Sequence, residues 1–240
     1  MTPLRVGLAG LGTVGGSVVR LLLDNAALFE RRAGRRLDLV RVASRTPKPE
    51  VDIGSATFDT ALASLDADDV DVVVELIGGV AAAQDVVATA IRAGRHVVTA
   101  NKALLAAHGE EIFEAAGRRG VSVGFEASVA GGIPIVNALR TGLAANRIDA
   151  IAGIVNGTSN YILTAMEEEG QHFAAALAEA QRLGYAEADP SFDVDGIDAA
   201  QKLAILAALA FDATIDFDGV HVEGISGIDI EDIRYARELG

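Results

Sequence analysis

The chain has 240 residues, half of them hydrophobic, which is enough for one large or two small domains with a sizeable core. It contains no cysteine, so disulfides, thiolate nucleophiles and cysteine-ligated zinc sites are excluded. The formal net charge of −14 argues against a nucleic-acid or membrane partner, because such partners bind basic patches. The sequence shows no signal-peptide pattern and no apolar run of membrane-spanning length, so we expect a cytoplasmic protein.

The N-terminal residues predict a strand, a glycine turn and a helix. Residues 4–8 are typical of a short buried strand, Gly10-Leu11-Gly12-Thr13-Val14-Gly15 follows, and residues 17–28 then show a helical apolar periodicity. In this context GxGxxG indicates a dinucleotide site. Gly10 permits the tight turn, Gly12 lets the backbone approach a pyrophosphate, and Gly15 lets the helix pack closely on the strand. The N–H groups of the helix N-terminus would bind the anion.

Strands and helices continue to alternate over the first half of the chain. Apolar runs predict strands at 37–44, 70–77, 96–100 and 121–127, and helical periodicity predicts helices at 82–93 and 103–119. Continuous apolar strands separated by helices are typical of a parallel, doubly wound α/β sheet of the Rossmann type.

The end of the second strand favours NADP over NAD. An NAD site usually presents a carboxylate there, but this strand ends in Ser44-Arg45. Arg45 could bind a 2′-phosphate, or it could be an ordinary surface arginine. We favour NADP and leave the use of NAD open.

The second half has a different composition and predicts an α+β domain. A helix at 135–143 leads into a strand at 147–155, and helices are expected at 162–169, 174–183 and 196–210. We therefore place a dinucleotide-binding domain at residues 1–132 and a substrate-binding and catalytic domain at 133–240.

Lysine is rare in this chain, with three lysines against seventeen arginines, which draws attention to Lys102 and Lys202. A lysine can lose and regain a proton when buried, whereas an arginine effectively cannot. Asp198 precedes Lys202 by four residues, so both lie on one helix face. An exposed pair of this kind is worth only about 0.3–0.5 kcal/mol and would be unremarkable. The acidic turn before the helix favours a functional pair; its carboxylates are Glu187, Asp189, Asp193 and Asp195.

Five blocks of sequence, in order, resemble homoserine dehydrogenase, and the resemblance covers nearly the whole chain. The blocks are residues 7–16, 74–79, 98–102, 126–135 with 156–161, and 184–202. The first block is common to many dehydrogenases, whereas the last, which begins Gly184-Tyr185-Ala186-Glu187-Ala188-Asp189-Pro190, is highly specific.

The resemblance implies reversible, NAD(P)-linked interconversion of L-homoserine and L-aspartate 4-semialdehyde, a step in threonine, methionine and isoleucine biosynthesis. It implies that Lys202 is the general acid/base, that Lys102 lies near the nicotinamide and the reacting oxygen, and that Asp198 positions Lys202. Glu187 and Asp193 would hold the substrate ammonium. The cofactor would contact Thr99 beside its ring and the glycine turn, including Thr13 and Val14.

The family also binds a monovalent cation, usually sodium, and forms homodimers. The matching cation ligands are the Glu126 side chain and the carbonyl oxygens of Val129, Gly131 and Ile133. Members continue beyond Gly240, so the resemblance predicts that the second domain is incomplete here.

Two other functions stay open at this point. Other two-domain NAD(P)-dependent oxidoreductases, such as sugar or dihydrodipicolinate reductases, share the glycine motif but lack the 184–202 block. A sensor that binds NADP without turnover is a second alternative, which the presence of Lys202, Asp198 and Glu187 disfavours.

Overall fold

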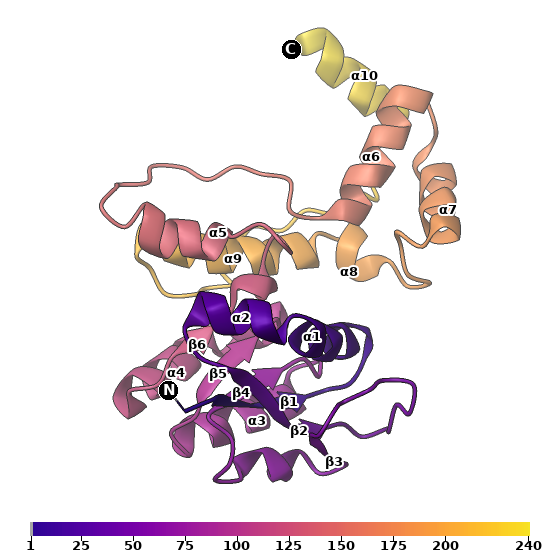
Figure 1. The fold of residues 1–240 in the computed structure, drawn as a ribbon. Coiled ribbons are helices and arrows are strands. Elements are labelled where there is room, and N and C mark those ends of the chain that lie inside the picture. Colours follow the sequence, from indigo (N-terminus) through magenta and orange to yellow (C-terminus); the bar gives the residue numbers. More distant parts are fainter. Residues whose placement is uncertain (1) are drawn as a thin grey trace. The chain divides into compact units, whose positions relative to one another are not determined.

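The computed structural model describes residues 2–240, which divide into two compact units, one ending at Gly142 and one beginning at Leu143 (Figure 1). Residues 133–142, expected in the second domain, belong to the first unit. There the carboxylate of Glu126 accepts hydrogen bonds from the backbone N–H groups of Val136 and Asn137, at 2.8 and 2.9 Å.

The first unit is built on a parallel six-stranded sheet, which confirms the predicted Rossmann architecture. The strand order is β3-β2-β1-β4-β5-β6. The strands are β1 (Leu4–Ala9), β2 (Leu37–Ala43), β3 (Thr57–Asp59), β4 (Val72–Glu75), β5 (His96–Thr99) and β6 (Val123–Gly124). The three-residue β3 was not predicted, because its sequence is too short to show an apolar pattern. The strand order reverses between β1 and β4, and ligands of open α/β sheets bind beyond the carboxyl ends of strands at such a point.

Helices cover both faces of this sheet, with α1 and α2 on one face and α3 and α4 on the other (Figure 1). Their apolar sides and the strands form a core that includes Leu8, Val42 and Val87, each fully buried. The helices are α1 (Thr13–Asp24), α2 (Ala26–Ala33), α3 (Ala81–Arg92), α4 (Lys102–Arg119) and the short α5 (Ile135–Asn137), with single 3₁₀ turns at Leu62–Asp66 and Glu126–Ser128 and a π-helical turn at Ala138–Gly142.

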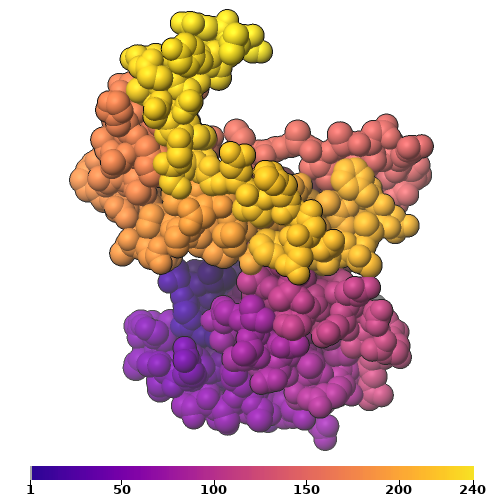
Figure 2. Space-filling model, turned by 180° about the vertical axis from the view of Figure 1, so that it is seen from behind, coloured from indigo at the N-terminus to yellow at the C-terminus, as the bar shows by residue number. Residues whose placement is uncertain are grey.

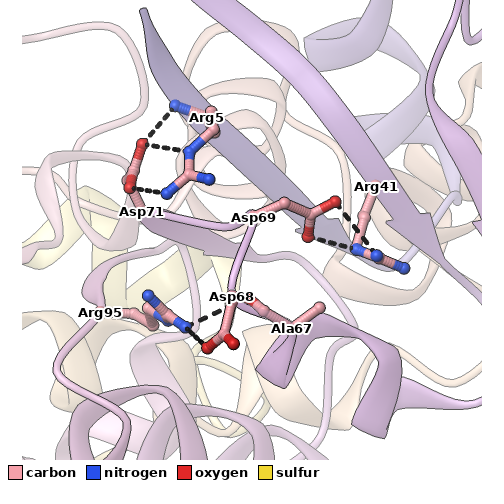
Figure 3. Close-up of polar contacts among 7 residues, drawn as sticks. All are labelled: Arg5, Arg41, Ala67, Asp68, Asp69, Asp71 and Arg95. Atoms are coloured by element: carbon pink, nitrogen blue, oxygen red, sulfur yellow. Dashed lines mark hydrogen bonds and ion pairs between the residues drawn. The ribbon is translucent and has the colours of Figure 1, made fainter. Parts of the chain in front are cut away.

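Three arginine–aspartate pairs fasten the segment that precedes β4 to its neighbours (Figure 3). Arg5 on β1 donates to both carboxylate oxygens of Asp71, at 3.0 and 2.6 Å. Arg41 on β2 binds Asp69 in the same bidentate way. Arg95, just before β5, lies 3.4 Å from the carboxylate of Asp68 and also donates to the carbonyl of Ala67. The Arg5 hydrogen bonds lower the pKa of the Asp71 carboxyl to about 2. Arg5, Asp71 and Arg95 lie at or just before the amino ends of β1, β4 and β5, whereas Arg41 lies within β2, so the pairs tie the segment before β4 to three strands of the sheet.

The second unit contains helices and no strand within residues 143–240. Its core lies where α6 meets α7 and α8, with Ile162 and Met166 fully buried. Helix α10 packs against α6, and α9 continues from α8. The helices are α6 (Gly157–Glu169), α7 (Phe173–Leu183), α8 (Ser191–Val194), α9 (Ile197–Phe211) and α10 (Ile230–Leu239).

The strand expected at 147–155 is therefore wrong. The segment pairs with no strand, and Ile154 is 78% exposed. Figure 2 shows the stretch leading to α6 as a thin run of chain beside open space. Its apolar alternation fits a pleated surface, but a strand also needs a neighbour for its backbone hydrogen bonds.

Across residues 2–240, no helix has both the length and the apolar composition to cross a bilayer.

Candidate functional site

In the glycine turn, two of the three motif glycines lie so close to neighbouring backbone that no side chain fits. Gly10 has a φ of +96°, and a Cβ there would lie 2.6 Å from the carbonyl oxygen of Leu76. A Cβ at Gly15 would lie 2.0 Å from the carbonyl oxygen of Gly10, so neither position can hold a larger residue without moving backbone. Gly12 has open space around it and caps α1, whose exposed first residues are Thr13 and Val14. The backbone donors at this helix end are thus placed to meet an anion.

A cavity of about 390 Å³ lies against this turn. The glycines form one side, and the loop that follows β2, including Arg45 and Lys48, forms another. Arg45 therefore shares a cavity with the glycine turn, and its contact with a 2′-phosphate stays a prediction. Lys48 shares the cavity too, and sequence reasoning missed it because it lies beyond the strand in a loop of no regular pattern.

Thr99 lies at the carboxyl edge of the sheet, bonded to a buried acid. Its hydroxyl donates to Oε2 of Glu75 over 2.6 Å, and Glu75 is completely buried. Asn101 caps α4 by accepting from the N–H of Leu104, so Lys102 occupies the first position of that helix, half-buried. The structure thus brings Thr99 and Lys102 to the edge where a bound nucleotide is expected.

The proposed cation ligands lie close together in the chain, between β6 and α5. Both oxygens of Glu126 already accept backbone N–H groups, and the carbonyl of Ile133 accepts from the N–H of Ile135. No group of three histidine or acidic side chains suited to a metal occurs in residues 2–240. A site made from one carboxylate and the carbonyls of Val129, Gly131 and Ile133 would not form such a group, so the cation stays a prediction.

Lys202 and Asp198 form a buried pair on α9. Lys202 Nζ lies 2.6 Å from Asp198 Oδ2, with the side chains 18% and 6% exposed. The ammonium also donates to the carbonyl oxygen of Val155 at 2.7 Å. These bonds use two of its three N–H groups and leave one for another acceptor. The low exposure removes the alternative of an ordinary surface ion pair.

Asn156, which sequence reasoning gave no role, connects this pair to Asp193. Its side-chain Nδ2 donates to Asp193 Oδ1 at 2.7 Å and to Asp198 Oδ2 at 2.8 Å. Its Oδ1 accepts from the N–H of Ser159 and caps α6. The signal that could have revealed it was the Asn-Gly-Thr-Ser turn before a helix, a pattern typical of an N-cap.

Asp193 and Glu187 have different surroundings. Asp193 is half-buried, and its second oxygen accepts from the hydroxyl of Thr158 at 3.1 Å. Glu187 is exposed, and only its backbone carbonyl bonds within the unit, to Gln181. The acidic turn thus provides one anchored carboxylate and one that faces solvent.

Fold and site together define a Rossmann-type dinucleotide-binding protein with a second, helical unit that carries a buried lysine–aspartate pair. The family model for homoserine dehydrogenase matches residues 134–240, and the model for the homoserine dehydrogenase NAD-binding domain matches residues 10–126. The chain belongs to the homoserine dehydrogenase family.

Individual relatives agree with this assignment. The chain is 53% identical to homoserine dehydrogenase of Pseudomonas aeruginosa, with all of this chain and 56% of the relative covered. A homoserine dehydrogenase structure from Thiobacillus denitrificans superposes with a TM-score of 0.95 at 53% identity, again covering all of this chain and 56% of the other. A structure from Archaeoglobus fulgidus assigned to the same enzyme gives 0.86 at 35% identity, with 99% and 77% covered. The chain thus spans about half the length of the bacterial relatives.

Proposed function

We propose that the protein transfers a hydride between NADP or NAD and L-homoserine, forming L-aspartate 4-semialdehyde and a proton, and that it also catalyses the reverse reaction. The observation that carries this proposal is the buried Lys202–Asp198 pair, which retains one ammonium N–H for a substrate oxygen. Family membership supplies the reaction class.

The residues of the first unit fit a dinucleotide. A larger residue would collide with backbone at Gly10 and Gly15, while Gly12 leaves room for a pyrophosphate. When bound, the nicotinamide accepts or donates the hydride. The protein's own contribution here is to hold that cofactor at the edge of the sheet near Thr99 and Lys102.

The surroundings of the cavity support a preference for NADP. Arg45 and Lys48 both line it, and no acidic side chain is among its lining residues. A 2′-phosphate carries negative charge that two cations would attract, whereas the ribose hydroxyl of NAD is usually held by a carboxylate.

Lys202 would exchange the proton of the reacting oxygen. In oxidation the substrate carbon loses a hydride and its hydroxyl loses a proton, which the lone pair of Lys202 as a neutral amine would accept; in reduction the ammonium would return a proton to the aldehyde oxygen. Asp198 and the carbonyl of Val155 fix the position of the lysine nitrogen. Glu187 and Asp193 supply negative charge for the amino acid's ammonium, with Glu187 the more accessible of the two.

Several further expectations rest on the family alone. They are a sodium ion at Glu126, Val129, Gly131 and Ile133, a homodimer, and a cytoplasmic location.

The proposed function is tested with L-homoserine and its O-methyl ether, using NADP as the oxidant and absorbance of the reduced nucleotide as the signal. The ether has no hydroxyl proton to lose, so only homoserine should be oxidised. Nucleotide binding without homoserine oxidation, also in a chain extended to the length of its relatives, would favour the sensor. Oxidation of a different alcohol would favour another reductase class.

A further inference from the structure

Glu75 is a buried acid to which neither the sequence nor the proposed reaction assigns a role. It ends β4, with Ala9 of β1 beside it on one side and Thr99 of β5 on the other. Its relative exposure is 0%. A carboxylate within an apolar strand loses its hydration, and that cost is tolerated only where hydrogen bonds replace the water.

Each oxygen of Glu75 accepts one hydrogen bond. Oε1 accepts from the backbone N–H of Ile77 at 2.8 Å, and Oε2 accepts from the Thr99 hydroxyl at 2.6 Å. The Thr99 oxygen in turn accepts from the N–H of Asn101 at 3.0 Å. The single hydroxyl proton of Thr99 is therefore committed to Glu75, which fixes the rotamer of the threonine.

The chain that follows Glu75 forms part of the wall of the cavity at the glycine turn. Leu76, Ile77 and Gly78 line that cavity together with Gly10 and Gly12. The Leu76 carbonyl lies so close to Gly10 that a Cβ there would be 2.6 Å away. Because Glu75 accepts a hydrogen bond from the N–H of Ile77, it fixes the backbone conformation where the chain comes closest to Gly10.

The same network reaches the start of α4. The side chain of Asn101 donates to the carbonyl of Gly79 at 2.6 Å and also caps the helix that begins with Lys102. The 76–79 segment is thus held at its start by Glu75 and at its end by Asn101. Glu75 and Thr99 are both completely buried, so neither side chain is exposed to a bound molecule.

We propose that Glu75 is a positioning residue for the nucleotide, acting through Ile77 and Thr99, an inference that rests on the proposed function. Its carboxylate holds the Ile77 backbone at the cavity wall and, through Thr99, the N–H of Asn101 at the start of α4, so that this order exists before the nucleotide arrives. A carboxylate needed only for folding would change stability and leave the affinity of the folded chain unaltered.

The test measures the Kd of NADPH by its fluorescence on binding, together with thermal unfolding of each variant. Glu75→Gln keeps the shape and an oxygen for Ile77 but turns an amide toward the Thr99 hydroxyl. Thr99→Val removes the same bond from its other end, whereas Thr99→Ser retains a hydroxyl. Asp85→Asn, an exposed acid on α3, is the matched control.

We expect Glu75→Gln and Thr99→Val each to raise the Kd about tenfold or more, a factor in the range expected for a lost buried hydrogen bond to a charged group. Thr99→Ser and Asp85→Asn should stay within about threefold of the parent. The double variant should bind no more weakly than the weaker single one, because both changes break one bond.

A folded Glu75→Gln variant with the parent's Kd would overturn the inference, as would fully additive effects in the double variant. If Glu75→Gln does not fold, the Thr99→Val and Thr99→Ser pair decides: equal affinities reject the inference, and rescue by serine supports it. If the parent chain fails to bind NADPH, the proposed function fails together with the inference. If the parent binds NADPH and Glu75→Gln binds it equally well, only the inference fails.

Discussion

Asp198 Oδ2 accepts hydrogen bonds from two residues at once, Lys202 on its own helix at 2.6 Å and Asn156 before α6 at 2.8 Å. The first bond is a local consequence of i,i+4 spacing, and the second connects residues 42 positions apart. A lysine held in this way has a fixed nitrogen position, which a proton-transfer group requires.

Replacing Asn156 with serine should slow turnover while keeping the helix cap. Serine can still accept from the N–H of Ser159, but it cannot donate to both Asp193 and Asp198. Loss of a buried bond to a carboxylate is worth about 1.5–3 kcal/mol, so we expect kcat for homoserine oxidation to fall roughly 10- to 100-fold. Asn160→Ser, an exposed change on the same helix, is the control. Equal rates in both variants would contradict the role assigned to Asn156.

Neutralising Asp198 should impair the reaction more than it impairs nucleotide binding. Asp198→Asn preserves size but removes the charge opposite Lys202, so kcat/KM for homoserine should fall by about two orders of magnitude, as for a misaligned acid/base group. Asp212→Asn at the far end of α9 provides the comparison. A decrease of the same size in the Asp212 variant would show that any change on this helix is harmful.

Removing the cations beside the glycine turn should change the choice of nucleotide. In Arg45→Ala and Lys48→Ala the KM for NADP should rise about tenfold, since each loses a charge-assisted contact with the 2′-phosphate, while the KM for NAD stays nearly constant. Arg31→Ala on α2 controls for a general loss of positive charge. Parallel changes for NADP and NAD would rule out 2′-phosphate recognition at these residues.

Acid should abolish the contribution of Asp71 to stability. The pKa of this carboxyl is about 2 in the folded protein, mainly through its hydrogen bond with Arg5, against about 3.9 in an unfolded chain. A group whose pKa is lower in the folded than in the unfolded protein contributes its full stabilisation above the unfolded pKa. That stabilisation is lost as the pH falls through the folded pKa.

The Tm difference between the parent and Asp71→Asn should therefore be full at pH 5 and above, and should shrink from pH 4 to pH 2. At neutral pH we expect Asp71→Asn to lower the free energy of unfolding by about 1 kcal/mol and no more, because solvent screens this partly exposed pair. The exposed change Asp218→Asn should show no such trend. A difference that stays constant down to pH 2 would refute this linkage.

Local patterns sufficed to predict the glycine turn and five of the six strands, all except β3. The strand, the turn at Gly10 and the start of α1 follow one another in sequence, and the spacing of Asp198 and Lys202 follows from helix geometry. The strand predicted at 147–155 was wrong because an alternating apolar pattern shows only that a segment could pack in a sheet. It does not show whether a neighbouring strand is present to pair with it.

The remaining site residues depend on contacts between distant parts of the chain. Glu75 meets Thr99 across 24 residues, and in the sequence it only interrupts an apolar run. Asn156 meets Asp193 across 37 residues. Hydrogen bonds of this range are set by the fold, so no local pattern reports them.

The most direct test of the whole account is homoserine-dependent reduction of NADP and NAD at alkaline pH, in the parent chain and in Lys202→Ala. We predict turnover in the parent and a loss of about a thousandfold or more in the variant, with the nucleotide Kd unchanged, because only the proton-accepting group has been removed. A Lys202→Ala variant that oxidises homoserine at a rate close to the parent's would contradict the assignment of Lys202 as the acid/base.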